Sequence, residues 1–124
     1  MELLWLGFCA HGGVLLPLYF GNNAEEPYSV TVAAYAFDGQ ALKYLKHGNE
    51  LTLPVVRGLC EPSIVAFQGK YYLTLRNDLK GYVCVSDDGL NYSPIQPWMF
   101  DDGTELGSYN TQQHWLSHSD GLFL

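Results

Sequence analysis

The chain has 124 residues, a length that suits about one small domain. Hydrophobic residues make up 48% and charged residues only 15%, which excludes an intrinsically disordered segment. Six basic residues against 13 acidic ones give a net charge of −7, and the basic ones are scattered, so we expect no nucleic-acid partner and no binding to anionic membrane surfaces.

The first segment, residues 3–10, is apolar but short, and Glu2 precedes it instead of a basic region. It therefore lacks the pattern of a signal peptide. No apolar run approaches the ~20 residues of a transmembrane helix, so the sequence predicts no membrane span.

Short runs rich in Val, Tyr, Leu and Thr follow one another along the chain, separated by Gly, Asp, Asn and Pro. No stretch keeps a helical period over three turns, so the sequence predicts an all-β protein. The predicted strands are 14–20, 28–37, 63–67, 70–76, 82–86 and 114–117.

These strands belong to an internal repeat. The Asp-Gly pair at 38–39 recurs at 88–89, and hairpin signals recur at 12–13, 68–69 and 120–121. Four short strands per ~50 residues are typical of a β-propeller blade. We predict blades over approximately 3–50 and 61–98 and a truncated third blade over 111–124.

A propeller needs about four to eight blades to close its ring. We therefore expect residues 1–124 to form one partial propeller domain of a longer protein. The alternative is self-association of several copies through open blade edges.

One predicted hairpin contains two candidate functional residues. Strands 63–67 and 70–76, joined by a two-residue turn at 68–69, would place Glu61 opposite Arg76, with the two side chains about 5 Å apart on one face. The same pattern also fits a cross-strand ion pair without function, which contributes little when exposed.

Polar residues gather at this end of the hairpin. Arg57 and Cys60 precede Glu61, while Asn77 and Asp78 follow the second strand. In a propeller, this end of the blade lies on the face that surrounds the central channel, where a ligand pocket can form.

The segments Cys60-Glu61-Pro62-Ser63-Ile64-Val65 and Gly69-Lys70-Tyr71-Tyr72-Leu73-Thr74-Leu75-Arg76-Asn77 resemble the central blade of the sialidases and their BNR-repeat relatives. That family comprises six-bladed propellers that hydrolyse terminal sialic acids. The resemblance implies that Glu61 is the acidic partner of a tyrosine nucleophile. It also implies that Arg76 belongs to an arginine triad, whose planar guanidinium groups match a sugar carboxylate. Arg57 and Asn77 are predicted to bind substrate beside them.

The resemblance also implies an exported protein that needs no cofactor. The first arginine and the aspartate acid/base of the family would lie before Met1, and the third arginine and the nucleophilic tyrosine would lie after Leu124. We therefore expect the chain on its own to be catalytically inactive.

Residues 86–92 resemble the Asp-box turn S-x-D-x-G-x-x-W, although the match is one residue short and has Tyr92 in place of Trp. The aspartate of such a turn caps backbone amides of its own loop. Its role is structural, far from the predicted site.

A second group of candidates starts the third blade. Gln112, Gln113 and His114 are predicted to hydrogen-bond sugar hydroxyls, with Trp115 packed on a sugar ring. A polar loop between blades with a buried tryptophan is the alternative. The four histidines show no ligand spacing and the three cysteines form no CxxC pair, so we predict no metal site and buried free thiols.

Three functions remain open. The first is a sialidase-like glycoside hydrolase acting on acidic sugars. The second is a five-bladed glycosidase of the arabinanase or invertase kind, with Glu61 as general acid. The third is a non-catalytic propeller that binds glycans or partners.

Overall fold

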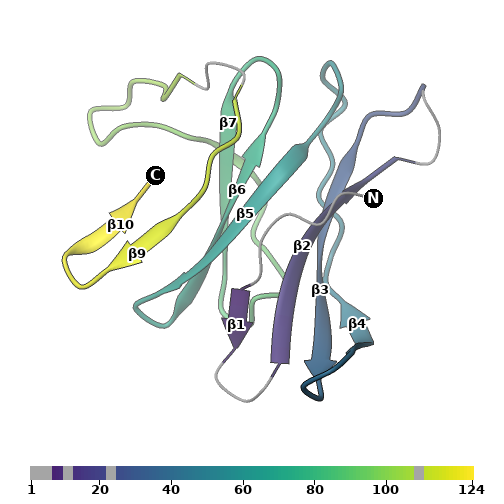
Figure 1. Ribbon diagram of the computed structural model, residues 1–124. Helices are drawn as coiled ribbons and strands as arrows, with labels where there is room; N and C mark the ends of the chain where they lie inside the picture. Colours follow the sequence, from purple (N-terminus) through teal and green to yellow (C-terminus); the bar gives the residue numbers. More distant parts are fainter. Residues whose placement is uncertain (1–6, 10–12, 22–24, 108–110) are drawn as a thin grey trace.

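The computed structural model describes residues 7–9, 13–21, 25–107 and 111–124, and the regular structure in them is antiparallel β-sheet throughout (Figure 1). These residues contain no helix, so the all-β prediction is confirmed for the described part of the chain. Three sheets follow one another in chain order.

The first sheet has the strand order β1-β2-β3-β4, with β1 at Gly7–Cys9, β2 at Gly13–Phe20, β3 at Ser29–Phe37 and β4 at Leu42–His47. All eight residues of β2 pair with β3, and each strand has four consecutive buried residues, as expected for runs rich in Val, Leu and Ala that are covered on both faces. The predicted strand bounds at 14–20 and 28–37 are confirmed to within one residue. The expected hairpin at 12–13 involves residues outside the described part.

The second sheet has the order β5-β6-β7-β8, with β5 at Cys60–Phe67, β6 at Lys70–Arg76, β7 at Gly81–Ser86 and β8 at Gln96–Pro97. Gln68 and Gly69 both have positive φ, 49° and 77°, as a two-residue type I′ turn requires. The predicted hairpin turn is therefore confirmed.

A hairpin of β9 (Leu116–His118) and β10 (Gly121–Phe123) follows the second sheet. Its turn is Ser119–Asp120, so the prediction of a turn at 120–121 was wrong. Gly121 pairs with His118 as the first residue of β10, and the Asp120 amide donates a hydrogen bond to His118 Nδ1 at 3.2 Å within the turn.

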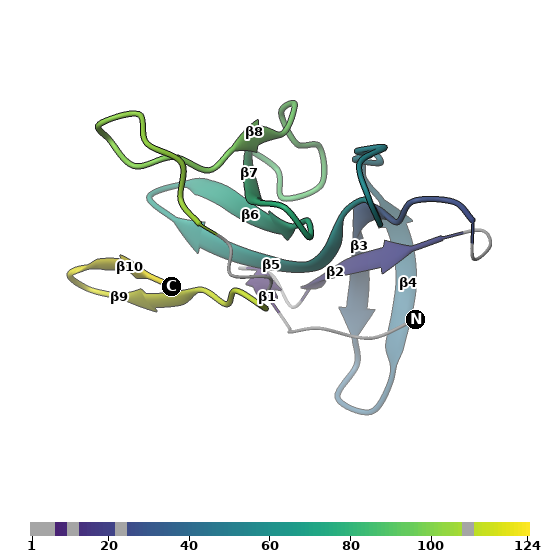
Figure 2. The ribbon, with the colours of Figure 1, turned by 90° about the horizontal axis from the view of Figure 1, so that it is seen from above.

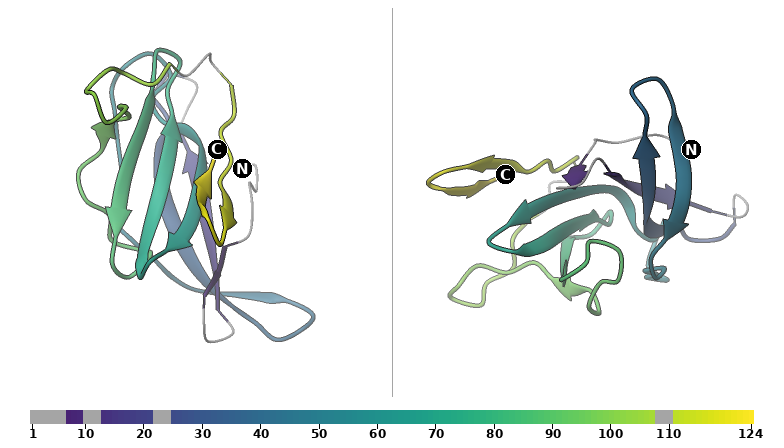
Figure 3. Two further views of the ribbon diagram at one scale, coloured as in Figure 1. Left: turned by 90° about the vertical axis from the view of Figure 1, so that its left-hand side faces the viewer. Right: turned by 90° about the horizontal axis from the view of Figure 1, so that it is seen from below.

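The core lies between the first two sheets. Val30 and Val32 of β3 face Leu73 and Leu75 of β6, and all four are fully buried together with Leu59 of the connecting segment. Strands β1 and β9 both contact β5, while β4 and β8 lie at the outer ends of their sheets (Figure 2). Seen from below, the first sheet, the second sheet and the hairpin of β9 and β10 extend in different directions from the region around β5 (Figure 3).

The Asp-box-like turn joins the two sheets. Asp88 Oδ1 accepts hydrogen bonds from the amides of Leu90 and Asn91 at 2.8 and 2.7 Å, as expected for a self-capped turn. The Asn49 side chain donates to the Tyr92 carbonyl at 3.1 Å and accepts from the Tyr92 amide at 2.8 Å, which ties this turn to the segment after β4. The turn follows Ser86, at the end of β7 opposite the end where Gly81 pairs with Arg76.

Candidate functional site

A β-bulge shapes the end of the second sheet. The predicted register between β5 and β6 is confirmed from Phe67 to Ser63, but Cys60, not Glu61, is opposite Arg76. The predicted pairing of Glu61 with Arg76 was therefore wrong at the backbone. The physical reason is that Pro62 has no N–H to continue the ladder, and Glu61 has a positive φ of 47°.

The bulge nevertheless brings the two predicted side chains together. Arg76 Nη1 donates to Glu61 Oε2 at 2.6 Å, and the side chains are only 9% and 17% exposed. Because both are largely withdrawn from water, this ion pair is screened less than one on the open surface.

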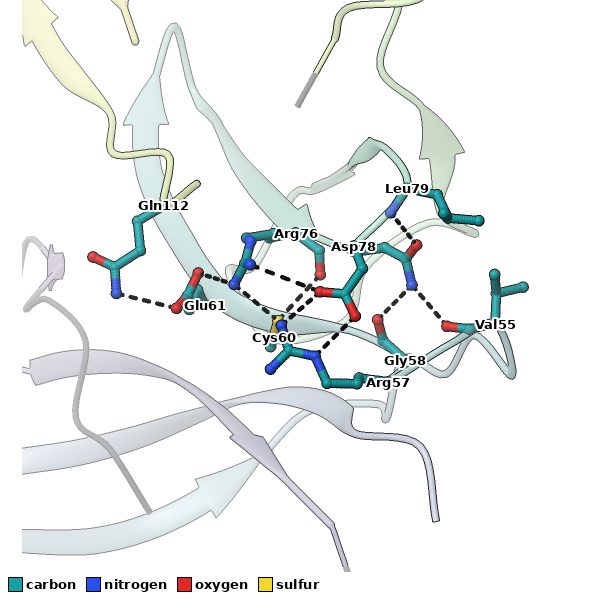
Figure 4. Close-up of polar contacts among 10 residues, drawn as sticks. Val55, Arg57, Gly58, Cys60, Glu61, Arg76, Asp78, Leu79 and Gln112 are labelled. Atoms are coloured by element: carbon teal, nitrogen blue, oxygen red, sulfur yellow. Dashed lines mark hydrogen bonds and ion pairs between the residues drawn. The ribbon is translucent and has the colours of Figure 1, made fainter. Parts of the chain in front are cut away.

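Asp78 extends the pair into a chain of alternating charges (Figure 4). Arg57 donates to it through Nε at 2.8 Å and Nη2 at 2.5 Å, a bidentate contact, and Arg76 Nη2 lies 3.7 Å from Asp78 Oδ1. The hydrogen bond from Arg57 lowers the pKa of Asp78 and raises the pKa of Arg57. We call Glu61, Arg76, Asp78 and Arg57 the charged cluster.

The segment leading to β9 covers one side of the charged cluster. Gln112 Nε2 donates to Glu61 Oε1 at 3.2 Å, and Gln112 Oε1 lies 3.3 Å from His114 Nε2. The Trp115 amide donates to Ser63 Oγ at 3.3 Å and anchors the segment on β5. Two of the three polar residues predicted here, Gln112 and His114, thus lie within one hydrogen-bonded chain that reaches Glu61.

Asn77 supports the charged cluster from behind. It is fully buried, its Nδ2 donates to the carbonyls of Val55 and Gly58 at 2.8 Å each, and its Oδ1 accepts from the Leu79 amide at 3.0 Å. Both amide hydrogens and the amide oxygen are committed to the backbone. The structure therefore places Asn77 as a support for the loop that carries Arg57, with no polar atom directed at a ligand.

Gln113 faces a different neighbour. A Cβ added at Gly81 would lie 3.3 Å from Gln113 Oε1 and 3.8 Å from the Trp98 ring, so Gln113 packs at the start of β7. The rings of Trp98 and Trp115 are 5.2 Å apart there. Trp115 is thus part of the packing between β9 and the second sheet, the alternative that the sequence left open.

Cys60 and Asp78 were not predicted as members of the site. Cys60 Sγ lies 3.7 Å from Arg76 Nη1 and donates to the Arg76 carbonyl at 3.6 Å, and burial raises the pKa of its thiol. Cys60 and Cys84 are both buried and free, as expected. Asp78 could have been predicted from the sequence as a member of the site, because two arginines at one end of a sheet require carboxylates nearby.

Within the described ranges, no group of three or more His, Cys, Asp and Glu side chains could hold a metal ion. The same residues form no helix long and apolar enough to cross a membrane.

Comparisons with protein-family models, with curated proteins and with solved structures find no match to this chain. The functional argument therefore depends on the geometry of the charged cluster and on the motifs within the sequence.

Proposed function

We propose that the chain is part of a β-propeller glycoside hydrolase of the sialidase kind. In this proposal the arginines of the charged cluster bind the carboxylate of an acidic sugar, and Glu61 is the acidic partner in the chemistry. The observation that carries the proposal is the Arg76–Glu61 contact of 2.6 Å at the bulged end of β5.

The arrangement of the sheets supports the propeller part of the proposal. Two four-stranded antiparallel sheets have their strands in chain order and pack face to face, as successive blades do. The self-capped turn at Asp88 follows the outer part of the second sheet, at the end away from Arg76.

The accessible guanidinium is that of Arg57, whose side chain is 53% exposed, whereas Arg76 is 9% exposed. Asp78 holds the Arg57 guanidinium in place by two hydrogen bonds. This lowers the side-chain entropy that is lost when an anion binds beside Arg57. An acidic sugar would approach Arg57 first and reach Arg76 by displacing Glu61 from part of its guanidinium.

In this proposal, Glu61 would contact the nucleophile through its Oε1 atom. Its Oε2 is held by Arg76, whereas Oε1 is bonded only to the exposed Gln112 amide among the described residues. Displacing Gln112 would open this oxygen to a tyrosine hydroxyl. No described tyrosine is hydrogen-bonded to Glu61, so the proposal assigns binding, and not turnover, to the described residues on their own.

The five-bladed alternative needs Glu61 as a general acid. The five-bladed enzymes act on neutral furanosides, which offer no carboxylate for a guanidinium to bind. Glu61 lies in a cluster with two arginines, Arg76 directly at 2.6 Å and Arg57 through Asp78. This favours the sialidase-like proposal over the alternative.

The test is a binding titration monitored by amide resonances, with the methyl α-glycoside of N-acetylneuraminic acid as ligand and methyl β-N-acetylglucosaminide as its neutral counterpart. Arg76→Lys keeps the charge but loses the planar fork, so it should weaken binding of the acidic sugar about tenfold and leave the neutral one unchanged. Lys70→Gln, which removes an exposed ion pair with Asp87 elsewhere on the second sheet, is the matched control. Equal binding of the two sugars, or an unaltered acidic-sugar affinity in Arg76→Lys, would reject the proposal.

A further inference from the structure

The basic side chains of this protein differ in whether they form ion pairs with carboxylates. All six lie in the described residues, and four of them form ion pairs with carboxylates. Those four are Arg57 with Asp78, Lys70 with Asp87, Arg76 with Glu61 and Lys80 with Glu105. Lys43 and Lys46 have no such partner among the described residues, although the chain's net charge is −7.

Both unpaired lysines belong to β4, the terminal strand of the first sheet (Figure 1). All six residues of β4 are exposed, and one backbone edge of the strand has no neighbouring strand in the described fold. Lys43 pairs with Ala36 and Lys46 with Ala34, so both lysines extend from the same face of the sheet over small side chains.

The opposite face of β4 is apolar. Tyr44 packs edge-to-face on Tyr35 with ring centroids 5.7 Å apart, and its hydroxyl is 2.6 Å from His47 Nδ1. These three residues line a groove of about 290 Å³ together with Leu18, Phe20, Thr31, Ala33 and Glu50. The carboxylate of Glu50 makes this face unfavourable for acidic groups.

We propose that the free edge of β4 binds an extended acidic segment of a partner protein by strand addition. Main-chain hydrogen bonds to an open sheet edge supply affinity, and alternate side chains supply specificity. Because successive residues of a strand point to opposite faces, the bound segment would alternate carboxylates toward Lys43 and Lys46 with apolar side chains toward the Tyr44 groove.

Lysine on an edge strand commonly discourages pairing between sheets. Here it would oppose pairing of β4 with a second β4, because four lysines would meet, but it attracts a strand that carries carboxylates. The bulge at Leu45 breaks the ladder between β3 and β4, so we expect regular main-chain pairing along residues 42–44, with a further carboxylate of the added strand reaching Lys46 beyond the bulge.

The probe is an acetylated and amidated octapeptide of alternating Glu and Val, followed by fluorescence anisotropy and by the backbone amide resonances of residues 42–47. The corresponding Lys-Val octapeptide tests charge. Two further acidic peptides, N-methylated on every Glu or on every Val, test the ladder, because N-methylation removes the donors that face β4 in one of the two frames.

We expect the acidic peptide to shift the β4 amides, the basic peptide not to bind, and one of the N-methylated peptides to lose binding. Replacing both Lys43 and Lys46 with Gln should weaken the acidic peptide about three- to tenfold, the effect of two exposed ion pairs. Lys70→Gln is the matched control and should leave the affinity unchanged. Equal binding of both N-methylated peptides, equal binding of the basic peptide, or shifts confined to residues outside β4 would each overturn the proposal.

Discussion

Glu61 reaches Arg76 from a bulged position, while the residue opposite Arg76 in the ladder is Cys60. The thiol therefore lies against the guanidinium, and the carboxylate approaches the same Nη1 nitrogen from the side. A bulge that redirects one side chain in this way is common next to functional sites. The arrangement also makes the ion pair part of the fold, because both of its members are mostly buried.

The Arg76–Glu61 pair should contribute measurably to stability. Glu61→Ala leaves a guanidinium that is 9% exposed without its closest carboxylate, so we expect the free energy of unfolding to fall by about 2–3 kcal/mol. Urea denaturation followed by tryptophan fluorescence measures this change.

The matched comparison is the Lys70–Asp87 pair, whose side chains are both well exposed. Lys70→Ala should leave the urea midpoint nearly unchanged, because exposed ion pairs contribute little. A loss for Glu61→Ala no greater than that for Lys70→Ala would show that the buried pair is not a stabilising element.

Asn77 was predicted to bind substrate, but its contacts predict a structural effect. Asn77→Ala removes three hydrogen bonds: the Gly58 carbonyl loses its Asn77 donor, the Leu79 amide loses its acceptor, and the Val55 carbonyl keeps only the Gly58 amide, so we expect a loss of about 2–3 kcal/mol in the free energy of unfolding. Sugar affinity measured under conditions where the variant remains folded should change less than in Arg76→Lys. A variant of wild-type stability with reduced sugar binding would instead support the original prediction.

The sequence predicted β3 and β6 well, because each is a run rich in Val, Ala, Tyr, Leu or Thr that ends near turn residues. Each contains four consecutive buried residues, and the predicted bounds agree with the structure to within one residue. Strand β4 is exposed at all six positions and has no such run, so only the preceding turn at 38–39 indicated that a strand follows.

The site was predicted in outline because hairpin register follows from turn length. That rule assumes an unbroken ladder along both strands. Because Pro62 has no N–H to continue the ladder, the rule did not predict the bulge at Glu61. The burial of Asn77 was not predicted either. Its partners Val55 and Gly58 lie in the loop before β5, and no local sequence pattern indicates the path of that loop.

Asp88 should make the fold sensitive to acid. Hydrogen bonds from the backbone, that of Asn91 first, hold the pKa of Asp88 well below its usual range. A carboxylate with a lowered pKa in the folded state stabilises the protein above its unfolded pKa of about 4, and this contribution is lost as the pH falls toward the folded value. We expect the melting temperature to decline below about pH 4, and Asp88→Asn should flatten that decline. Thermal unfolding between pH 2.5 and 7 measures both effects, and a parallel decline in wild type and variant would contradict the assignment.

Two glycines with similar backbone conformations should respond differently to the same substitution. Gly39 and Gly89 have φ values of 96° and 76°, so alanine at either position costs about 1–2 kcal/mol of backbone strain. A Cβ at Gly39 would have no atom within 4 Å, whereas a Cβ at Gly89 would lie 2.5 Å from Leu15 Cδ1 and 3.3 Å from the Tyr71 ring. Gly89→Ala must therefore displace core side chains between the two sheets, and we expect it to destabilise the protein by about 1–3 kcal/mol more than Gly39→Ala. Urea unfolding of the two variants measures the difference. Equal losses would mean that the Asp88 turn does not pack between the first and second sheets as the structure describes.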